Sequence, residues 1–193
     1  LHAMETIAPE DVKVADNTEA SGRSTLQALD QALAFVQAGV IDAIVFAPFN
    51  KASMHMADLG HADELHYMAE KLGATGYISE LNTLDGMWTS RVTSHIALKD
   101  VSAAIDGDRI REATLLIDGV LRRAGYARPR IAVAAPNPHA GDGGNFGRED
   151  IDVIAPAGRP LAEQPMAVDG TRPPATAALR ALLRHRLRRS RHT

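Results

Sequence analysis

The stretch RIAVAAPNPHAGDGGNFG, from Arg130 to Gly147, decides how the rest of the chain is interpreted. After Arg130 it is a continuous run of small apolar side chains that ends at Pro136, which is typical of a parallel strand buried on both faces. His139 follows in a glycine-rich loop just past the carboxyl end of that strand, where ligands bind in open α/β sheets. The glycine spacing fits neither a dinucleotide fingerprint nor a phosphate-binding loop with its lysine. The position of the loop therefore predicts a binding site, but its glycine spacing does not indicate which cofactor would bind there.

A single histidine in such a loop commonly has no special function. A functional site is favoured here because histidines also follow other predicted strands. The segment Met87–Ser94 alternates like a strand and ends at His95. The apolar segment Ile41–Ala47 is a further predicted strand, which leads through the next loop to His61. Three strands therefore deliver polar groups to the same edge of the predicted sheet.

Three helices are expected between these strands. Apolar stripes at helical spacing predict helices at about Ser24–Ala38, Asp63–Leu72 and Asp108–Ala124, each followed by a glycine that ends it. The alternation of helix and strand predicts the α/β class, with a mainly parallel sheet flanked by helices. His61 would lie just before the amino end of the second helix, where free backbone N–H groups favour an anion.

Composition limits the classes of partner. The 193 residues are 45% hydrophobic and include no cysteine, which excludes thiolate metal sites and disulfides and fits a cytoplasmic protein. No run approaches the length of a membrane span and no signal segment is evident, so we expect no membrane partner. Residues 1–169 carry 14 basic and 24 acidic side chains, and this acidic body argues against nucleic acid.

The chain changes composition near its end. Residues 170–193 contain seven arginines and no acid, so we expect a partial α/β domain over 1–169 and a separate arginine-rich tail over 170–193. The tail has two interpretations. A basic amphipathic helix for a membrane or nucleic acid is one, and a non-native or disordered terminus, as a shifted reading frame would give, is the one we favour.

Four motifs follow one another along the chain. They are Ala47-Pro48-Phe49-Asn50-Lys51, Gly60-His61, Ser94-His95-Ile96-Ala97-Leu98 and Asn137-Pro138-His139-Ala140-Gly141-Asp142-Gly143-Gly144 with Phe146-Gly147-Arg148-Glu149-Asp150. Taken together and in this order, they resemble the 4-hydroxythreonine-4-phosphate dehydrogenase family of pyridoxal phosphate biosynthesis. The resemblance runs from about Glu19 to Asp169, and the family's amino-terminal segment and carboxyl-terminal third have no counterpart here.

The resemblance implies a metal-dependent, NAD- or NADP-linked homodimer that oxidises and decarboxylates a small phosphorylated hydroxy acid. Its fold would be the two-lobed one of isocitrate and isopropylmalate dehydrogenases. His95 and His139 match two metal-ligand histidines, and His61 matches a substrate-binding histidine. Ala62 occupies the next substrate-binding position, where the family usually has threonine, so a hydroxyl that would contact the substrate is lost.

The implied metal would act on the substrate's hydroxyl group. A divalent ion held by neutral imidazoles lowers the pKa of that hydroxyl, so that hydride can pass to the nicotinamide, and it stabilises the enolate formed as carbon dioxide departs. Imidazole ligands suit zinc or cobalt, whereas magnesium prefers oxygen, so the identity of the metal stays open. Lys51 has two equal interpretations, as a phosphate ligand or as part of a loop cap.

Departures from the family leave three hypotheses open. The family's third metal histidine, which the partner subunit donates from an H-D-Q-G stretch, has no equivalent here, and no catalytic or cofactor-binding residue can be assigned. The first hypothesis is the 4-hydroxythreonine-4-phosphate dehydrogenase. The second is a dehydrogenase of the same family acting on 4-phospho-D-threonate or 4-phospho-D-erythronate, which Ala62 makes plausible. The third is a catalytically inactive truncated fragment.

Overall fold

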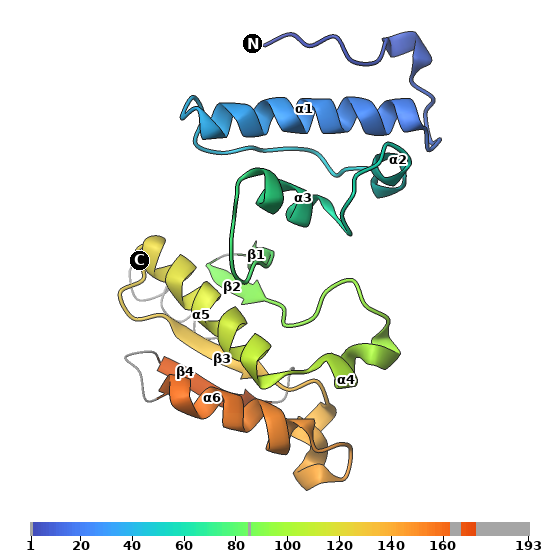
Figure 1. Cartoon of the computed structure of the whole chain (residues 1–193). Coiled ribbons are helices and arrows are strands. Elements are labelled where there is room, and N and C mark those ends of the chain that lie inside the picture. The colour runs from blue at the N-terminus through green and yellow to red at the C-terminus, as the bar shows by residue number, and fades with distance from the viewer. Residues whose placement is uncertain (1, 85, 163–166, 173–193) are drawn as a thin grey trace, which may run out of the picture. The chain divides into compact units, whose positions relative to one another are not determined.

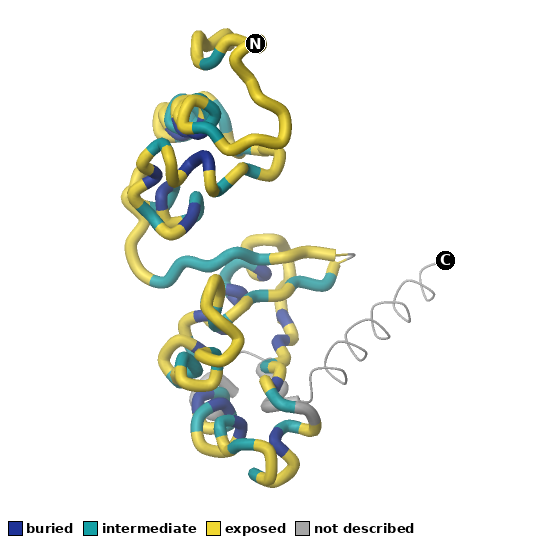
Figure 2. Tube along the Cα trace, turned by 90° about the vertical axis from the view of Figure 1, so that its right-hand side faces the viewer, coloured by how far each residue is buried: buried dark blue, intermediate teal, exposed yellow. Residues whose placement is uncertain are grey.

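The computed structural model describes residues 2–84, 86–162 and 167–172 (Figure 1). The chain divides into two compact units, Leu1–Gly76 and Tyr77–Thr193, each of which has its own elements and core. Buried positions are a minority in both units and concentrate where helices pack (Figure 2). In the part of the chain that the structure describes, no helix is long and apolar enough to cross a membrane.

The first unit is helical. It contains a short 3₁₀ turn, η1 (Pro9–Asp11), and the helices α1 (Glu19–Gln37), α2 (Lys51–Met56) and α3 (Glu64–Lys71). Each helix begins at a side-chain cap that accepts a hydrogen bond from a free backbone N–H, namely Thr18, Asn50 and Asp63. The core lies between the helices and consists of Leu26, Leu29, Leu33, Met54, Leu59 and Tyr67.

The apolar stripe predicted for α1 is confirmed, but its predicted start is wrong. The helix begins at Glu19, five residues before Ser24, because Thr18 accepts a hydrogen bond from the Ser21 backbone N–H and so caps the helix there. The second predicted helix is confirmed within a residue at each end, with Asp63 as its cap.

The strand predicted over Ile41–Ala47 does not form. That segment has no regular structure, and Val45 is 96% exposed. A strand requires a hydrogen-bonded neighbour, and no described segment pairs with this one. Ile44 still packs against the core of this unit, but the segment has no hydrogen-bonded neighbour among the described residues that would make it a strand.

The second unit combines two small sheets with helices. Its elements are β1 (Leu81–Leu84), β2 (Met87–Ser90), η2 (Leu98–Asp100), α4 (Val101–Ala104), α5 (Gly107–Arg123), β3 (Arg130–Ala134), η3 (Pro138–Gly144), the π-helical turn η4 (Asp150–Ile154), α6 (Ala155–Ala162) and β4 (Ala167–Arg172). Strands β1 and β2 form an antiparallel hairpin, and β3 pairs with β4 in parallel.

Helix α5 forms the core of this unit, as its predicted stripe requires. Ile117 and Leu121 pack on Ile131 of β3 and on the hairpin residue Trp88, while Ile110 packs on Ile154 at the end of η4. The helix begins after Asp106, whose side chain accepts from the Arg109 backbone N–H. Figure 1 shows α5, β3, β4 and α6 as neighbours within this unit, in agreement with their contacts.

The α/β class is confirmed, but the predicted sheet is not. The described residues form two separate two-stranded sheets, one antiparallel and one parallel, instead of a mainly parallel sheet. Strand β3 is covered on one face only, because Ile131 is buried whereas Ala132 and Ala134 on the other face are exposed. The strand predicted to reach Ser94 ends at Ser90. Most of the proposed tail over 170–193 lies outside the described residues, so the division at residue 169 stays a prediction.

Candidate functional site

Both histidines predicted to bind metal lie in the second unit, in loops beyond strands. His139 follows β3 at the start of η3, and His95 lies five residues beyond the end of β2. Both side chains are exposed, and both backbones are left-handed, with φ of 55° at His139 and 57° at His95. A left-handed conformation is uncommon for a residue with a Cβ atom and concentrates at functional sites.

The loop that carries His139 is a left-handed turn. Five consecutive residues, His139 to Gly143, have φ between 48° and 75°. Three of them are not glycine, and each such residue costs about 1–2 kcal/mol relative to the right-handed form. The Phe146 backbone N–H donates to the Gly141 carbonyl over 3.1 Å and closes the loop. The neighbouring structure therefore holds this histidine in a conformation that its own backbone does not favour.

Two acidic residues, Glu149 and Asp150, follow this loop in the chain and lie close to its glycines. Neither was predicted to be a site residue. Asp150 is only 3% exposed. Within the described residues, neither of its carboxylate oxygens has a hydrogen-bond partner of normal geometry, and Glu149 Oε2 is also buried without one. Glu149 Oε1 accepts from the Ser102 hydroxyl.

The pKa values of the two carboxyl groups are shifted in opposite directions. Burial raises the pKa of Asp150, the negative charge of Glu149 raises it further, and the amide of Asn137 lowers it in part. The Ser102 hydrogen bond lowers the pKa of Glu149. The Glu-Asp pair beside a glycine-rich loop is visible in the sequence, but its burial is not.

His61 and Ala62 belong to the first unit. His61 Nε2 lies 2.8 Å from Glu70 Oε2, and its ring meets the Tyr67 ring edge-on at 5.9 Å between centroids. The His61 imidazole thus contacts side chains of α3, including Glu70 near the end of that helix, instead of lying unpaired before its amino end. Ala62 is exposed and offers no hydrogen-bonding group, and the following residue, Asp63, is occupied as the cap of α3. The joint site of His61 with His95 and His139 stays a prediction, because the two units are described separately.

Lys51, whose role the sequence left open, begins α2 and pairs with a carboxylate. Its Nζ lies 3.2 Å from Glu64 Oε2 at the start of α3, and the Glu64 side chain is 15% exposed. The pair links α2 to α3, which favours a structural role over phosphate binding.

The chemistry of the two exposed imidazoles fits two ligands of a divalent ion. Among the residues that the structure describes, however, no group of three histidine, cysteine or acidic side chains could hold a metal. A complete metal site built on these two imidazoles therefore needs a donor from outside these residues, and no reaction step can be built on a metal that the two histidines alone would hold.

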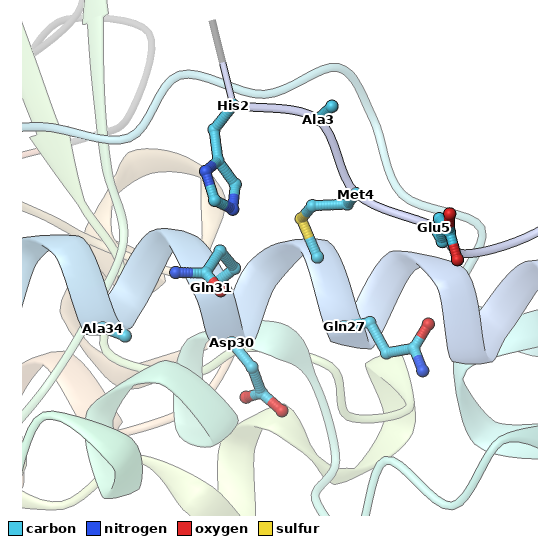
Figure 3. A pocket seen from close by; sticks show the side chains of 8 residues that line it. All are labelled: His2, Ala3, Met4, Glu5, Gln27, Asp30, Gln31 and Ala34. Carbon is cyan, nitrogen blue, oxygen red and sulfur yellow. The ribbon is translucent and has the colours of Figure 1, made fainter.

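The first unit contains a hollow beside α1. A hollow of about 520 Å³ separates the amino-terminal segment from α1, with His2 and Met4 on one side and Gln27, Asp30 and Gln31 on the other (Figure 3). None of the four predicted site residues lines it.

Comparison with known proteins gives a consistent result. Residues 2–185 match the family model described as Pyridoxal phosphate biosynthetic protein PdxA. A Pseudomonas aeruginosa protein named "Putative 4-hydroxythreonine-4-phosphate dehydrogenase 2" is 47% identical over 180 residues, which cover 93% of this chain and 53% of that protein. D-threonate 4-phosphate dehydrogenase of Pectobacterium atrosepticum is 33% identical over 161 residues, covering 83% of this chain and 49% of that one.

A solved structure agrees with these relatives. The crystal structure of 4-hydroxythreonine-4-phosphate dehydrogenase from Klebsiella pneumoniae matches with a TM-score of 0.76 and 32% identity, over 87% of this chain and 51% of that one. The chain thus spans about half the length of the relatives that it matches.

Proposed function

Because the chain belongs to the PdxA family of pyridoxal phosphate biosynthetic proteins, we propose that the protein oxidises and decarboxylates 4-hydroxythreonine-4-phosphate in vitamin B6 synthesis. The observation that carries this proposal is the family match over residues 2–185, which includes the His139 loop. The names of the Pseudomonas and Klebsiella proteins support the same substrate. The fold would be the two-lobed one of isocitrate dehydrogenase, and the protein would act in the cytoplasm.

The reaction requires an acceptor for hydride and a group that stabilises negative charge. We assign NAD or NADP as the acceptor, which takes hydride from the carbon that bears the hydroxyl group while the hydroxyl proton is released. The resulting β-keto acid then loses carbon dioxide. A divalent metal, whether zinc, cobalt or magnesium, would supply the charge stabilisation in both steps.

His95 and His139 are our candidates for two of the metal ligands. Both imidazoles are exposed, and imidazole nitrogen is a preferred ligand of zinc and cobalt. The third ligand would come from a second subunit of a homodimer. His61 would contact the substrate phosphate, for which it must first leave Glu70.

A second substrate is favoured by one residue of this chain. Ala62 lacks the hydroxyl that the family usually places beside the substrate-binding histidine. A lost hydrogen bond of this kind costs about 1–3 kcal/mol when its partner stays buried. The Pectobacterium relative is named for D-threonate 4-phosphate, so 4-phospho-D-threonate or the related 4-phospho-D-erythronate is the alternative substrate.

The test is an assay of NAD and NADP reduction by the purified protein with each of the three substrates, with and without Zn²⁺, Co²⁺ or Mg²⁺. We expect metal-dependent turnover of 4-hydroxythreonine-4-phosphate. Turnover of a sugar-acid phosphate alone would establish the alternative substrate. A folded protein that turns over none of them would contradict both proposals and support the inactive fragment.

Variants separate the metal ligands from other histidines. His139→Ala and His95→Ala should each lower kcat by at least about 100-fold, since each removes a ligand of the ion that stabilises the developing charge. His55→Ala is the matched control, because His55 lies in the last turn of α2 and outside the candidate site. Equal activity of His139→Ala and His55→Ala would exclude the proposed metal site.

A further inference from the structure

Oxygen atoms of the backbone and of two carboxylates lie close to two glycines of the His139 loop, Gly141 and Gly147. A Cβ atom added to Gly141 would lie 2.8 Å from the Gly147 carbonyl oxygen and 3.6 Å from Asp150 Oδ2. A Cβ atom added to Gly147 would collide with Glu149 Oε2 and lie 3.2 Å from Asn137 Nδ2. The absence of both side chains thus leaves the oxygens of Gly147, Glu149 and Asp150 crowded around the two glycines.

Three of the carboxylate oxygens at this place are buried and lack a protein partner. They are both oxygens of Asp150 and Oε2 of Glu149, judged over the residues that the structure describes. A buried carboxylate without compensation is strongly disfavoured and is normally paired, protonated or bound to a cation. The start of a helix at this point favours negative charge, but that effect is weaker than the loss of hydration.

The basic residue next to these carboxylates in the sequence is paired with another acid. Arg148 donates from Nε and Nη2 to the two carboxylate oxygens of Asp152 over 2.9 and 2.8 Å, so its charge is used one turn away. The Asn137 amide approaches Asp150 without normal hydrogen-bond geometry. The Gly147 carbonyl and Asp150 Oδ2 both lie beside Gly141, Glu149 Oε2 lies beside Gly147, and the charge of Glu149 acts on Asp150, so two negative groups and a backbone carbonyl lie near one another.

We propose that a hard divalent cation, of the Mg²⁺ or Ca²⁺ class, binds between the His139 loop and η4, held by the carboxylates of Asp150 and Glu149 and the Gly147 carbonyl. Such ions take oxygen ligands, and carboxylates together with backbone carbonyls are their usual donors. The charge of the ion matches that of the two carboxylates. The site is distinct from the imidazole pair, because it contains no nitrogen ligand.

Binding would add a link between the loop and η4, which already pack against each other. The Gly147 carbonyl belongs to the loop, whereas Asp150 begins the helix that continues as α6. An ion that holds both would stabilise the left-handed turn that carries His139. The consequence is a structural cation that supports the candidate site without taking part in its chemistry.

The test is calorimetric titration of Ca²⁺ and, separately, Mg²⁺ into protein that has been treated with EDTA and dialysed. We expect one saturable site with a Kd between about 10⁻⁵ and 10⁻³ M. Asp150→Asn and Glu149→Gln should each weaken it at least about tenfold, because each removes one ligand charge. Asp152→Asn is the matched control, since this nearby acid is exposed and paired with Arg148, and it should bind like the wild type.

Two further measurements make the outcome decisive. His139→Ala should keep the Ca²⁺ site, because an imidazole is not among its ligands, so the result does not depend on the dehydrogenase proposal. Circular dichroism will show whether each variant is folded. If Asp150→Asn does not fold, Glu149→Gln tests the same site. No saturable binding of either ion by the wild type, or equal binding by the folded acidic-site variants, would overturn the proposal.

Discussion

Two aspartates at helix starts, Asp63 in the first unit and Asp150 in the second, are almost equally buried, at 4% and 3% exposure. Asp63 Oδ1 accepts from the His66 backbone N–H over 3.0 Å and lies 2.6 Å from the His66 ring nitrogen. Neither oxygen of Asp150 has a comparable partner among the described residues. Asp63 is the cap residue of α3 and stabilises that helix, whereas Asp150 is the first residue of η4, after Glu149 at the cap position, and carries a desolvation cost there. Burial alone does not distinguish a structural carboxylate from one that awaits a ligand; its partners do.

The largest expected effect comes from a substitution that disrupts the packing of α1 against α2 in the first unit. Gly22 of α1 lies against the backbone of α2, and a Cβ atom there would overlap the Ser53 carbonyl group. Gly22→Ala should lower the free energy of unfolding by about 3 kcal/mol, because the two helices must separate. Urea unfolding followed by circular dichroism measures it.

Gly119→Ala is the matched control for that variant. Gly119 lies within α5, and the nearest atom to an added Cβ is the flexible Arg123 guanidinium at 3.5 Å. This change should stabilise the protein by about 0.5–1 kcal/mol, since alanine favours a helix interior. Destabilisation by both variants to the same extent would contradict the tight α1–α2 packing.

The next effect tests Asp63 directly. Asp63→Ala removes the cap of α3 together with its His66 contact, and we expect a loss of about 2 kcal/mol. Asp63→Asn should lose much less, because asparagine caps helices as well as aspartate does. Amide hydrogen exchange at the first turn of α3 is the measurement. Equal protection in the alanine variant and the wild type would show that the cap contributes nothing.

A smaller effect concerns the tyrosine that links α3 to α1. The Tyr67 hydroxyl donates to Asp30 Oδ1 over 2.6 Å. Burial first, and then this hydrogen bond, raise the pKa of Tyr67 above its ordinary value of about 10. The folded protein thus holds the phenol proton more tightly than the unfolded chain. The stabilisation is complete below about pH 10 and is lost as pH rises through the raised pKa.

Tyr67→Phe should therefore cost about 1.5 kcal/mol at neutral pH, because it removes a hydrogen bond to a charged acceptor. It should also reduce the loss of stability as the pH rises above about 10. Tyr126→Phe, at an exposed tyrosine, should keep the wild-type pH profile. Urea unfolding at a series of pH values decides it, and identical profiles for both variants would exclude the Tyr67 contribution.

How far the sequence predicted these features depends on whether the determining contacts are local. The bounds of α5 were predicted closely, because its apolar spacing lies within the helix itself and its cap residue, Asp106, directly precedes it. The segment 41–47 has an equally good strand pattern, but a strand depends on a distant partner that the pattern does not contain. His139 was selected from its place after β3, whereas its left-handed backbone and the buried Asp150 depend on how the loop folds back on η4.

The smallest expected effect is the most informative about the comparison. Asp150→Asn replaces a buried, uncompensated carboxylate by a neutral amide of nearly the same shape, so in cation-free buffer at neutral pH it should cost about 0 kcal/mol or stabilise slightly. The corresponding change at Asp63 also costs little, but there because the cap is kept. Addition of Ca²⁺ separates the two positions: it should stabilise the wild type and Asp63→Asn, and leave Asp150→Asn unchanged. Trp88, the only tryptophan of the chain, packs beside α5 in the second unit and reports unfolding there by fluorescence. A loss of several kcal/mol in cation-free Asp150→Asn would mean that this carboxylate is satisfied by the protein itself, and the contrast between the two aspartates would disappear.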